Sequence, residues 1–260
     1  MKRLDMLVCE TLGVSREYAK ELILAGKCTV SGKTVLRPGA KFPEDASISI
    51  DAEPPQFVSR GGMKLKKAIE VFNIDLQDAM CIDIGASTGG FTDCMLQHGA
   101  SRVLAIENGA GQLHPKLTAD PRVISQEGMD IRVLDAAKLP FVPQFAAADL
   151  SFISATLALP KVSEILPSGG GAVVLIKPQF EVGRGKADKK GVVKDLKYHI
   201  DAIQKVCGAA QDLGLMPQGL DFSPIRGQNG NREYLLFAAK GGEATAFDAE
   251  EVVRRAFREL

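Results

Sequence analysis

The sequence is organised around a short apolar run that ends in an acid and then breaks into glycines. Residues 81–93 read CIDIGASTGGFTD. An apolar run, a glycine-rich break and a new apolar-periodic segment predict a buried strand, a tight turn and the start of a helix. Glycines let the backbone turn sharply and let a ligand approach it, and Ser87 and Thr88 can bond the free amides at the helix start. At such a turn an α/β sheet binds its ligand.

The spacing of these glycines narrows the class of ligand. Gly85, Gly89 and Gly90 fit neither the dinucleotide fingerprint nor a phosphate loop, because no Gly-Lys-Ser/Thr follows. The spacing suits sheets that bind S-adenosylmethionine, in which the turn backs onto the amino-acid part of the cofactor. Glu107 closes the next predicted strand, at about the 20-residue offset where an acid meets ribose hydroxyls. A nucleoside-bearing cofactor is therefore expected, with a purely structural turn as the alternative.

From Ala79 onward, strand and helix patterns alternate, which predicts an α/β fold with a doubly wound, Rossmann-like and mostly parallel sheet of seven strands. The expected strands are residues 79–84, 102–107, 122–126, 145–150, 171–177, 217–223 and 233–239. Asp149 and Lys177 end the fourth and fifth of these strands. They are therefore expected at the carboxyl edge of the sheet, where the glycine turn also lies.

The first 53 residues predict a separate, small α+β domain. Helical spacing covers residues 4–12 and 16–25, and short strands are expected within 28–35 and at 46–50. A stiff Pro-Pro break then marks a domain boundary. The expected organisation is a domain at 1–53, a linker at 54–63, the sheet domain at 64–242 and a C-terminal helix within 243–260. The basic residues of the first domain form either an RNA-binding face or an ordinary solvated face.

The composition limits the remaining possibilities. The 32 Lys and Arg balance the 32 Asp and Glu, so the charge of the whole chain argues neither for nor against nucleic acid. Five scattered cysteines without a C-x-x-C pair favour free thiols in a reducing cytosol over disulfides or zinc, and the three histidines lack metal-ligand spacing. We see no signal peptide and no apolar run long enough to cross a membrane. A cytoplasmic protein with no membrane role and no metal is expected.

Several motifs resemble known families. Residues 2–52 resemble the S-four-type RNA-binding domain, through RLD at 3–5, SREYAK at 15–20, ILAG at 23–26 and VSG at 30–32. The second part carries SRGGMKL at 59–65, ADLSFIS at 148–154, IKPQFEVGR at 176–184, GVVKD at 191–195 followed by His199, and SPIRGQNGNRE at 223–233. Together these motifs resemble the TlyA family, in which an FtsJ-type ribosomal RNA 2'-O-methyltransferase is fused to an S-four-type domain. Members are often labelled haemolysins.

The resemblance implies a reaction and a set of catalytic residues. It implies S-adenosylmethionine-dependent methylation of a ribose 2'-hydroxyl in ribosomal RNA, within ribosomal subunits. The Lys-Asp-Lys-Glu set of FtsJ-type enzymes falls on Lys64, Asp149, Lys177 and Glu233. Two lysines and two acids in one cleft can set each other's protonation, and Lys177 either acts as a base, which requires a lowered pKa, or orients the hydroxyl. Two structural ion pairs are the alternative interpretation.

Binding residues follow from the same motifs and charges. The expected cofactor-binding residues are Asp83, Gly85, Ser87, Thr88, Gly89, Gly90, Phe91, Glu107, Asp130 and Asp149. The expected RNA-binding residues are Arg3, Arg16, Lys20, Lys27, Arg37, Arg60, Arg184 and Lys186. Two positions depart from the family pattern, since Glu107 replaces the usual Asp and Asp130 replaces the Asn of an Asn-x-Arg motif. Both replacements keep an oxygen acceptor.

Two other functions remain as alternatives. A membrane-active haemolysin would need an export signal, an amphipathic insertion segment or a barrel-forming strand array, and the sequence shows none of them. An RNA-binding protein with an inactive methyltransferase fold is the second alternative. The intact Lys-Asp-Lys-Glu set argues against it.

Overall fold

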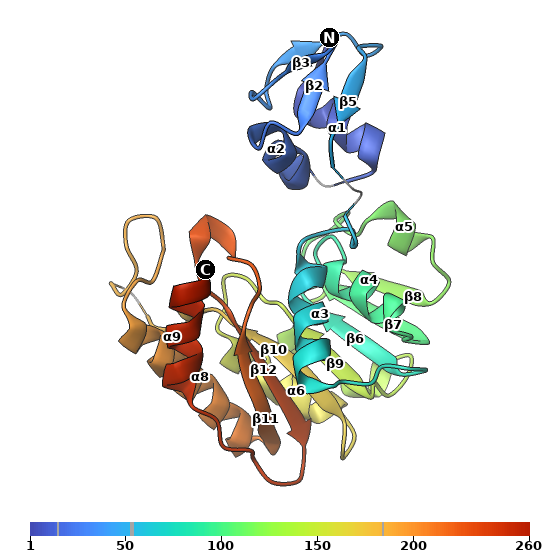
Figure 1. Cartoon of the computed structure of the whole chain (residues 1–260). Coiled ribbons are helices and arrows are strands. Elements are labelled where there is room, and N and C mark those ends of the chain that lie inside the picture. The colour runs from blue at the N-terminus through green and yellow to red at the C-terminus, as the bar shows by residue number, and fades with distance from the viewer. Residues whose placement is uncertain (15, 53–54, 184) are drawn as a thin grey trace. The chain divides into compact units, whose positions relative to one another are not determined.

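The computed structural model describes the chain at residues 1–14, 16–52, 55–183 and 185–260. The chain divides into two compact units, Met1–Arg60 and Gly61–Leu260 (Figure 1). Two of the expectations, a linker that starts at Pro54 and an RNA contact at Arg184, lie outside the described residues.

The first unit combines two helices with two small antiparallel sheets. Its helices are α1 (Leu4–Leu12) and α2 (Arg16–Leu24). One sheet has the order β3-β2-β5, and the other pairs β1 with β4. The strands are β1 (Lys2–Arg3), β2 (Cys28–Val30), β3 (Lys33–Thr34), β4 (Lys41–Phe42) and β5 (Ile48–Ile50). The sequence did not predict β1 and β4, because a two-residue strand is too short to show an alternating pattern.

Local sequence explains the turns of this unit. Gly13 ends α1 in the left-handed region, with φ at 64°. Ser31 and Gly32 both have positive φ, which gives the two-residue turn that joins β2 to β3 with the twist of a hairpin. The core lies between the helices and the three-stranded sheet, where Val8 and Ile23 are fully buried.

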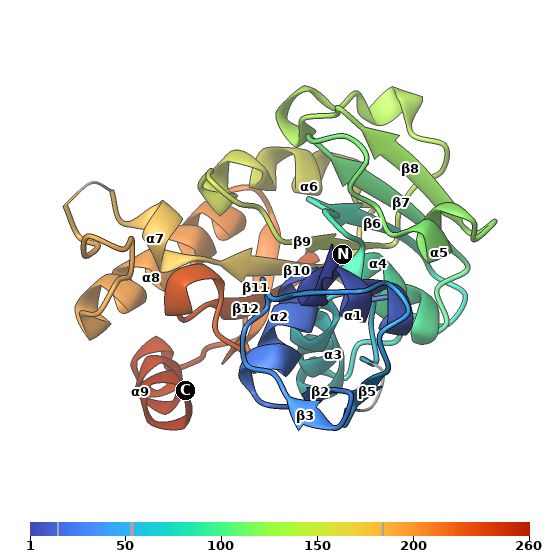
Figure 2. The same cartoon turned by 90° about the horizontal axis from the view of Figure 1, so that it is seen from above.

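The second unit is built on one seven-stranded sheet with the order β11-β12-β10-β9-β6-β7-β8. The strands are β6 (Met80–Ile84), β7 (Arg102–Glu107), β8 (Val123–Glu127), β9 (Phe145–Ala148), β10 (Gly171–Ile176), β11 (Leu215–Phe222) and β12 (Tyr234–Lys240). Five strands are parallel, and β12 runs antiparallel to both β10 and β11. Figure 2 shows the parallel strands following one another from β10 to β8. This mostly parallel α/β sheet confirms the fold class predicted from the sequence.

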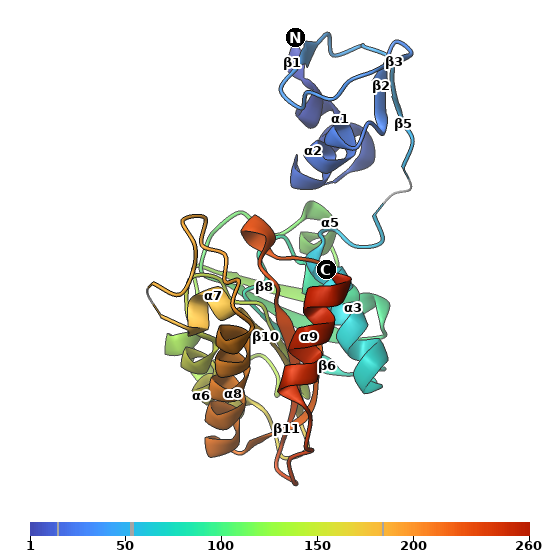
Figure 3. The same ribbon diagram turned by 60° about the vertical axis from the view of Figure 1, so that its left-hand side comes forward.

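Helices cover both faces of this sheet. The helices are α3 (Gly61–Phe72), α4 (Gly90–Gln97), α5 (Pro115–Thr118), α6 (Leu159–Ile165), α7 (Pro178–Glu181), α8 (Leu196–Asp212) and α9 (Ala249–Glu259). Short 3-10 turns are η1 (Ile131–Val133), η2 (Ala136–Lys138), η3 (Ala155–Leu157) and η4 (Gln228–Gly230). Helices α6 and α8 lie on one face and α3 on the other (Figure 3). Among the helices of the described residues, none is long and apolar enough to cross a membrane.

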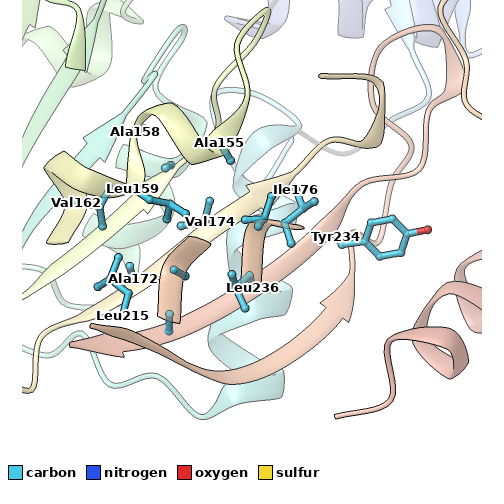
Figure 4. Packing of buried hydrophobic residues seen from close by; sticks show 14 of the residues in the cluster. Ala155, Ala158, Leu159, Val162, Ala172, Val174, Ile176, Leu215, Tyr234 and Leu236 are labelled. Atoms are coloured by element: carbon cyan, nitrogen blue, oxygen red, sulfur yellow. The ribbon is translucent and has the colours of Figure 1, made fainter. Parts of the chain in front are cut away.

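The main core lies between the sheet and helices α6, α8 and α9. Ala172, Val174 and Ile176 alternate along β10, so their side chains point to the same face. Leu159 and Val162 of α6 pack against that face, as Figure 4 shows. The C-terminal helix α9 also buries apolar residues in this core and is thus part of the second unit.

Strands β9, β10 and β11 end earlier than the sequence predicts, and the ends of β9 and β10 position the site. Strand β9 ends at Ala148 and β10 ends at Ile176, so Asp149 and Lys177 are the first residues beyond them. Lys177 precedes Pro178, which opens α7, and a residue before proline is kept out of the helical region. Both side chains therefore stand at the carboxyl edge of the sheet.

Candidate active site at the carboxyl edge of the sheet

Four charged side chains that are distant in the sequence meet in one cluster. The Nζ atom of Lys64 lies 3.2 Å from Oδ2 of Asp149 and 2.7 Å from Oε2 of Glu233. The Nζ atom of Lys177 lies 2.5 Å from Oδ1 of Asp149. The structure thus brings together the four residues expected to be catalytic, in the order Glu233, Lys64, Asp149, Lys177.

The topology explains why these residues meet. Strands β9 and β10 are parallel neighbours, so Asp149 and Lys177 follow adjacent strand ends. Strand β12 is antiparallel to β10, and its first residue, Tyr234, pairs with Ile176. Glu233, one residue earlier, therefore arrives at the same edge from the opposite direction. Lys64 comes from the first turns of α3 and completes the cluster.

The cluster is largely shielded from water. The side chain of Glu233 is 2% exposed, that of Lys64 is 10% exposed and that of Asp149 is 19% exposed. Burial alone would lower the pKa of Lys64, but the carboxylates of Asp149 and Glu233 outweigh burial and raise it. Burial would likewise raise the pKa of Asp149, but Lys64 and Lys177 outweigh it and the pKa is lowered. The charged forms of Lys64 and Asp149 therefore stabilise each other.

A cavity of about 360 Å³ opens beside this cluster. Its wall is formed by Ile84, Gly85, Ser87, Ile106, Glu107, Asn108, Gln112, Met129, Asp130, Ile131, Arg132, Asp149, Leu150, Ser151, Phe152 and Ile153. Asp149 belongs to both the cluster and the cavity wall. A molecule bound in the cavity would therefore lie next to the charged cluster.

The glycine turn forms part of the cavity wall and leaves no room for a side chain. Gly85 has a φ of 83°, and a Cβ atom there would lie 2.7 Å from the backbone oxygen of Asp149. The amides of Gly85 and Ala86 both donate to the carbonyl of Ile106, which holds the turn against the end of β7. The turn and the cluster are therefore packed directly against each other.

Glu107 stands where the sequence places it, at the end of β7 and in the cavity wall. Its carboxylate accepts hydrogen bonds from the amide of Ser87, at 2.9 Å, and from the amide of Gly109, at 2.8 Å. Asp130 also lines the cavity, and its carboxylate is paired with Arg132. Both acids remain partly exposed and offer oxygen acceptors.

Asp83 has a different position from the one expected. Its side chain is fully buried, is absent from the cavity wall and accepts hydrogen bonds from the amide and hydroxyl of Thr92, at 2.9 and 2.6 Å. Asp83, rather than Ser87 or Thr88, thus caps the start of α4. Burial raises the pKa of this carboxyl to about 7. Four other residues expected to bind the cofactor also lie outside the cavity wall: Thr88, Gly89, Gly90 and Phe91.

The cavity fits a nucleoside-bearing cation better than a phosphate. Carboxylates of Glu107 and Asp130 can accept hydrogen bonds from sugar hydroxyls or amino groups, while apolar side chains such as Ile106 and Ile131 provide surfaces for a ring. Asp149 adds a third carboxylate. Among the described residues, no cluster of three or more potential metal ligands occurs.

Sequence reasoning missed two residues at the site. Ser151 accepts a hydrogen bond from Nζ of Lys177 at 3.1 Å, and it lies in the same ADLSFIS motif as Asp149. Lys67, three residues after Lys64 in α3, pairs with Asp221 at 3.0 Å and lies 3.5 Å from the ring centre of Phe222. Lys67 thereby anchors α3, which carries Lys64, to strand β11.

In the first unit, the expected RNA-binding residues fall into three groups. Arg3 and Arg16 both bond the buried carboxylate of Asp5, at 2.8 and 3.0 Å. Lys27 pairs with Asp51 and Arg60 with Glu21, each at 3.0 Å. In the part of the chain that the structure describes, Lys20 and Arg37 form no ion pair. In the second unit, Nζ of Lys186 lies 4.8 Å from the ring centre of Tyr198.

Comparison with known proteins identifies a methyltransferase family. Residues 57–240 match the model of the FtsJ-like methyltransferase family. YqxC of Bacillus subtilis, described as a candidate rRNA methyltransferase, is 40% identical over 258 residues, which cover 97% of this chain and 92% of that protein. The 16S/23S rRNA (cytidine-2'-O)-methyltransferase TlyA of Mycobacterium tuberculosis is 37% identical over 256 residues, which cover 97% of this chain and 96% of that protein.

A solved structure agrees with these relatives. A protein of Streptococcus thermophilus, described as a candidate haemolysin, is 40% identical and superposes with a TM-score of 0.82. The match covers 99% of this chain and 96% of the other. The chain therefore belongs to the FtsJ-like methyltransferase family, in its TlyA branch.

Proposed function

We propose that this protein is an S-adenosylmethionine-dependent methyltransferase that modifies a ribose 2'-hydroxyl in ribosomal RNA. The observation that carries the proposal is the cluster of Lys64, Asp149, Lys177 and Glu233, which lies beside a cavity suited to a nucleoside. Its TlyA relative in Mycobacterium tuberculosis is named for the same reaction on cytidine. The proposal also places the protein in the cytoplasm, where its RNA substrate is made.

The cofactor would occupy the cavity against the glycine turn. Gly85 lets the amino-acid part approach the backbone, Glu107 accepts hydrogen bonds from the ribose hydroxyls, and Asp130 lies within reach of the adenosine part. When bound, the cofactor supplies a methyl group that is already activated by a positively charged sulfur. The protein therefore has to align the acceptor oxygen and manage one proton.

The charged cluster provides that alignment. Lys177 is directed toward the acceptor hydroxyl and is fixed by the carboxylate of Asp149, 2.5 Å away. Lys64 bridges Asp149 and Glu233, so it stabilises two acids that would otherwise repel each other. Protonated Lys177 would donate a hydrogen bond to the hydroxyl oxygen, and the hydroxyl proton would pass to solvent water as that oxygen takes the methyl group. In this arrangement, Lys64 and the buried Glu233 hold the Asp149 carboxylate in place on the side away from Lys177.

The two units divide the work. In this proposal, residues 1–53 bind RNA, residues 54–63 connect the domains, and residues 64–242, completed by the helix within 243–260, carry out the transfer. Lys20 and Arg37 would neutralise RNA phosphates directly. Arg3 and Arg16 are held in place by Asp5, and each side chain remains more than 40% exposed, so both can still face a phosphate.

Primer extension over ribosomal RNA tests the proposal in cells. RNA from cells with the protein should show a methylation-dependent stop that RNA from cells without it lacks. Lys177→Ala should lose the stop, whereas Lys138→Ala, which changes an exposed lysine on η2, should keep it. Identical patterns with and without the wild-type protein would refute the proposed function.

A further inference from the structure

Ser151 lies at the boundary between the cavity and the charged cluster. It follows Asp149 by two residues, is exposed and forms part of the cavity wall. Its Oγ accepts a hydrogen bond from Nζ of Lys177 at 3.1 Å, while the same Nζ lies 2.5 Å from Oδ1 of Asp149. Ser151 therefore contacts the lysine from the side of the cavity.

These two contacts limit the directions in which Lys177 can donate. A protonated lysine amine has three N–H groups in a tetrahedral arrangement. The hydrogen bond to Ser151 takes one of them, and the ion pair with Asp149 fixes the amine on a second side, so few directions remain for a third partner. A free lysine side chain samples many rotamers, and two fixed contacts remove most of that freedom before a substrate arrives.

The loop that carries Ser151 is itself tightly held. Phe152 has a φ of 68°, which is an unfavourable conformation for an aromatic residue and requires support from its surroundings. Glu181 provides this support, because its buried carboxylate accepts hydrogen bonds from the hydroxyl of Ser154 and from the amide of Ala155. Lys205 of α8 pairs with the same carboxylate at 2.9 Å.

Helix α7 connects the two anchor points. Lys177 directly precedes this four-residue helix and Glu181 is its last residue. The loop is thus bonded to both ends of α7, through Ser151 at one end and through Ser154 and Ala155 at the other. The bonds to Glu181 therefore hold the loop beside α7, which keeps the Ser151 hydroxyl within reach of the end of the Lys177 side chain.

We propose that Ser151 is a positioning residue that directs the amine of Lys177 toward the acceptor hydroxyl. This role deepens the function proposed above and rests on it. Ser151 contacts the lysine without taking part in bond formation, and alanine at this position removes only the hydroxyl and keeps the backbone of the cavity wall. The variant loses alignment, and misalignment reduces the rate of the chemical step more than it reduces binding.

Three variants distinguish a positioning role of the Ser151 hydroxyl from a role in maintaining the fold. Ser151→Ala removes the hydroxyl, and Ser151→Thr keeps it. Ser101→Ala is the matched control, because the Ser101 hydroxyl also makes a local hydrogen bond, to the carbonyl of Asp78, at the start of β7. For each full-length variant, steady-state kinetics with ribosomal RNA as substrate give kcat and KM. Calorimetry gives the affinity for S-adenosylhomocysteine.

We expect Ser151→Ala to lower kcat by roughly ten- to a hundredfold, with KM for RNA and cofactor affinity within about twofold of wild type. Ser151→Thr should recover most of kcat, and Ser101→Ala should match wild type. Full kcat in Ser151→Ala would overturn the role. Equal losses in Ser151→Ala and Ser151→Thr would also overturn it, because the hydroxyl would then be irrelevant.

A second readout does not depend on activity. The side-chain ammonium resonance of Lys177, assigned by its loss in Lys177→Arg, should shift in Ser151→Ala and stay near its wild-type position in Ser101→Ala. An unmoved resonance in Ser151→Ala would contradict the contact. If the resonance shifts but wild-type protein transfers no methyl group to RNA, the contact stands and the proposed function fails.

Discussion

Lys64 of helix α3 and Glu233, which directly precedes strand β12, form a buried ion pair with 2.7 Å between Nζ and Oε2. The pair joins the first helix of the second unit to its last strand, across most of the sequence of that unit. Removing one partner would leave the other charge buried without compensation, which is far more destabilising than losing an exposed pair.

Lys64→Met should therefore lower the free energy of unfolding by about 3 to 5 kcal/mol. The control is Lys138→Met, because Lys138 is 83% exposed and pairs with Asp135 at 3.3 Å. That exposed pair should contribute less than about 1 kcal/mol. Urea unfolding of both variants measures the free energy of unfolding. Equal decreases in the two variants would show that the buried pair stabilises the fold no more than the exposed pair does.

Gly85→Ala should be destabilising while the same substitution at Gly208 is stabilising. A Cβ at Gly85 would meet the Asp149 backbone oxygen at 2.7 Å and would hold a positive φ, which costs about 1 to 3 kcal/mol. Gly208 lies inside α8 with open space around it, so alanine there should add up to about 1 kcal/mol through helix propensity. Thermal unfolding checks both signs. A neutral Gly85→Ala would mean that the turn can relax away from Asp149.

Glu107→Gln should weaken binding of S-adenosylhomocysteine by about tenfold, because a charged acceptor is replaced by a neutral one that can no longer bond both neighbouring amides and the ribose. Glu164→Gln on α6 is the control, since that exposed side chain pairs only with Lys161 in the described structure. Isothermal calorimetry gives both affinities. Unchanged binding by Glu107→Gln would place the ribose elsewhere.

The raised pKa of Asp83 predicts how the free energy of unfolding depends on pH. Burial, followed by the neighbouring carboxylates of Asp149 and Glu107, raises its pKa from 3.8 to about 7, although hydrogen bonds from Thr92 oppose the rise. In the folded state this group therefore keeps its proton at pH values where the unfolded chain has lost it. Its contribution to stability is fully present below about pH 4 and is lost as the pH rises through about 7.

Asp83→Asn should remove this loss, because asparagine keeps an oxygen acceptor for Thr92 and does not ionise. Relative to wild type, the variant should gain stability between pH 5 and pH 8, by an amount on the order of a few kcal/mol. Asp212→Asn, at an exposed position near the end of α8, should show no such trend. Urea titrations at several pH values test this, and a constant difference between Asp83→Asn and wild type would contradict the raised pKa.

The sequence predicted the sheet well because strands alternate with helices and five of the seven strands, β6, β7, β9, β10 and β12, carry apolar runs. It also predicted the cluster, because family motifs mark Lys64, Asp149, Lys177 and Glu233. The position of Asp83 could have been found from alternation alone. Ile82 and Ile84 face the core on one side of β6, so the residue between them must point to the opposite face, away from their packing partners.

Other features depend on tertiary contacts that no local pattern contains. Lys67 is one helical turn from Lys64 and looks like any surface lysine until β11 brings Asp221 and Phe222 against it. Ser151 meets Lys177 because the parallel strands β9 and β10 end side by side and Glu181 of α7 bonds the following residues of the Ser151 loop. Arg3 and Arg16 look like free phosphate-binding residues until Asp5, buried in α1, is found between them.

The most direct test is to locate the transferred methyl group by mass spectrometry. Ribosomal RNA is incubated with the purified protein and methyl-labelled S-adenosylmethionine, digested to nucleosides and analysed. The account predicts label on the ribose of one nucleoside, no transfer by Lys177→Ala despite normal cofactor binding, and no transfer to RNA that lacks the 2'-hydroxyl at the target nucleotide. Label on a base, or transfer to the deoxy substrate, would contradict it.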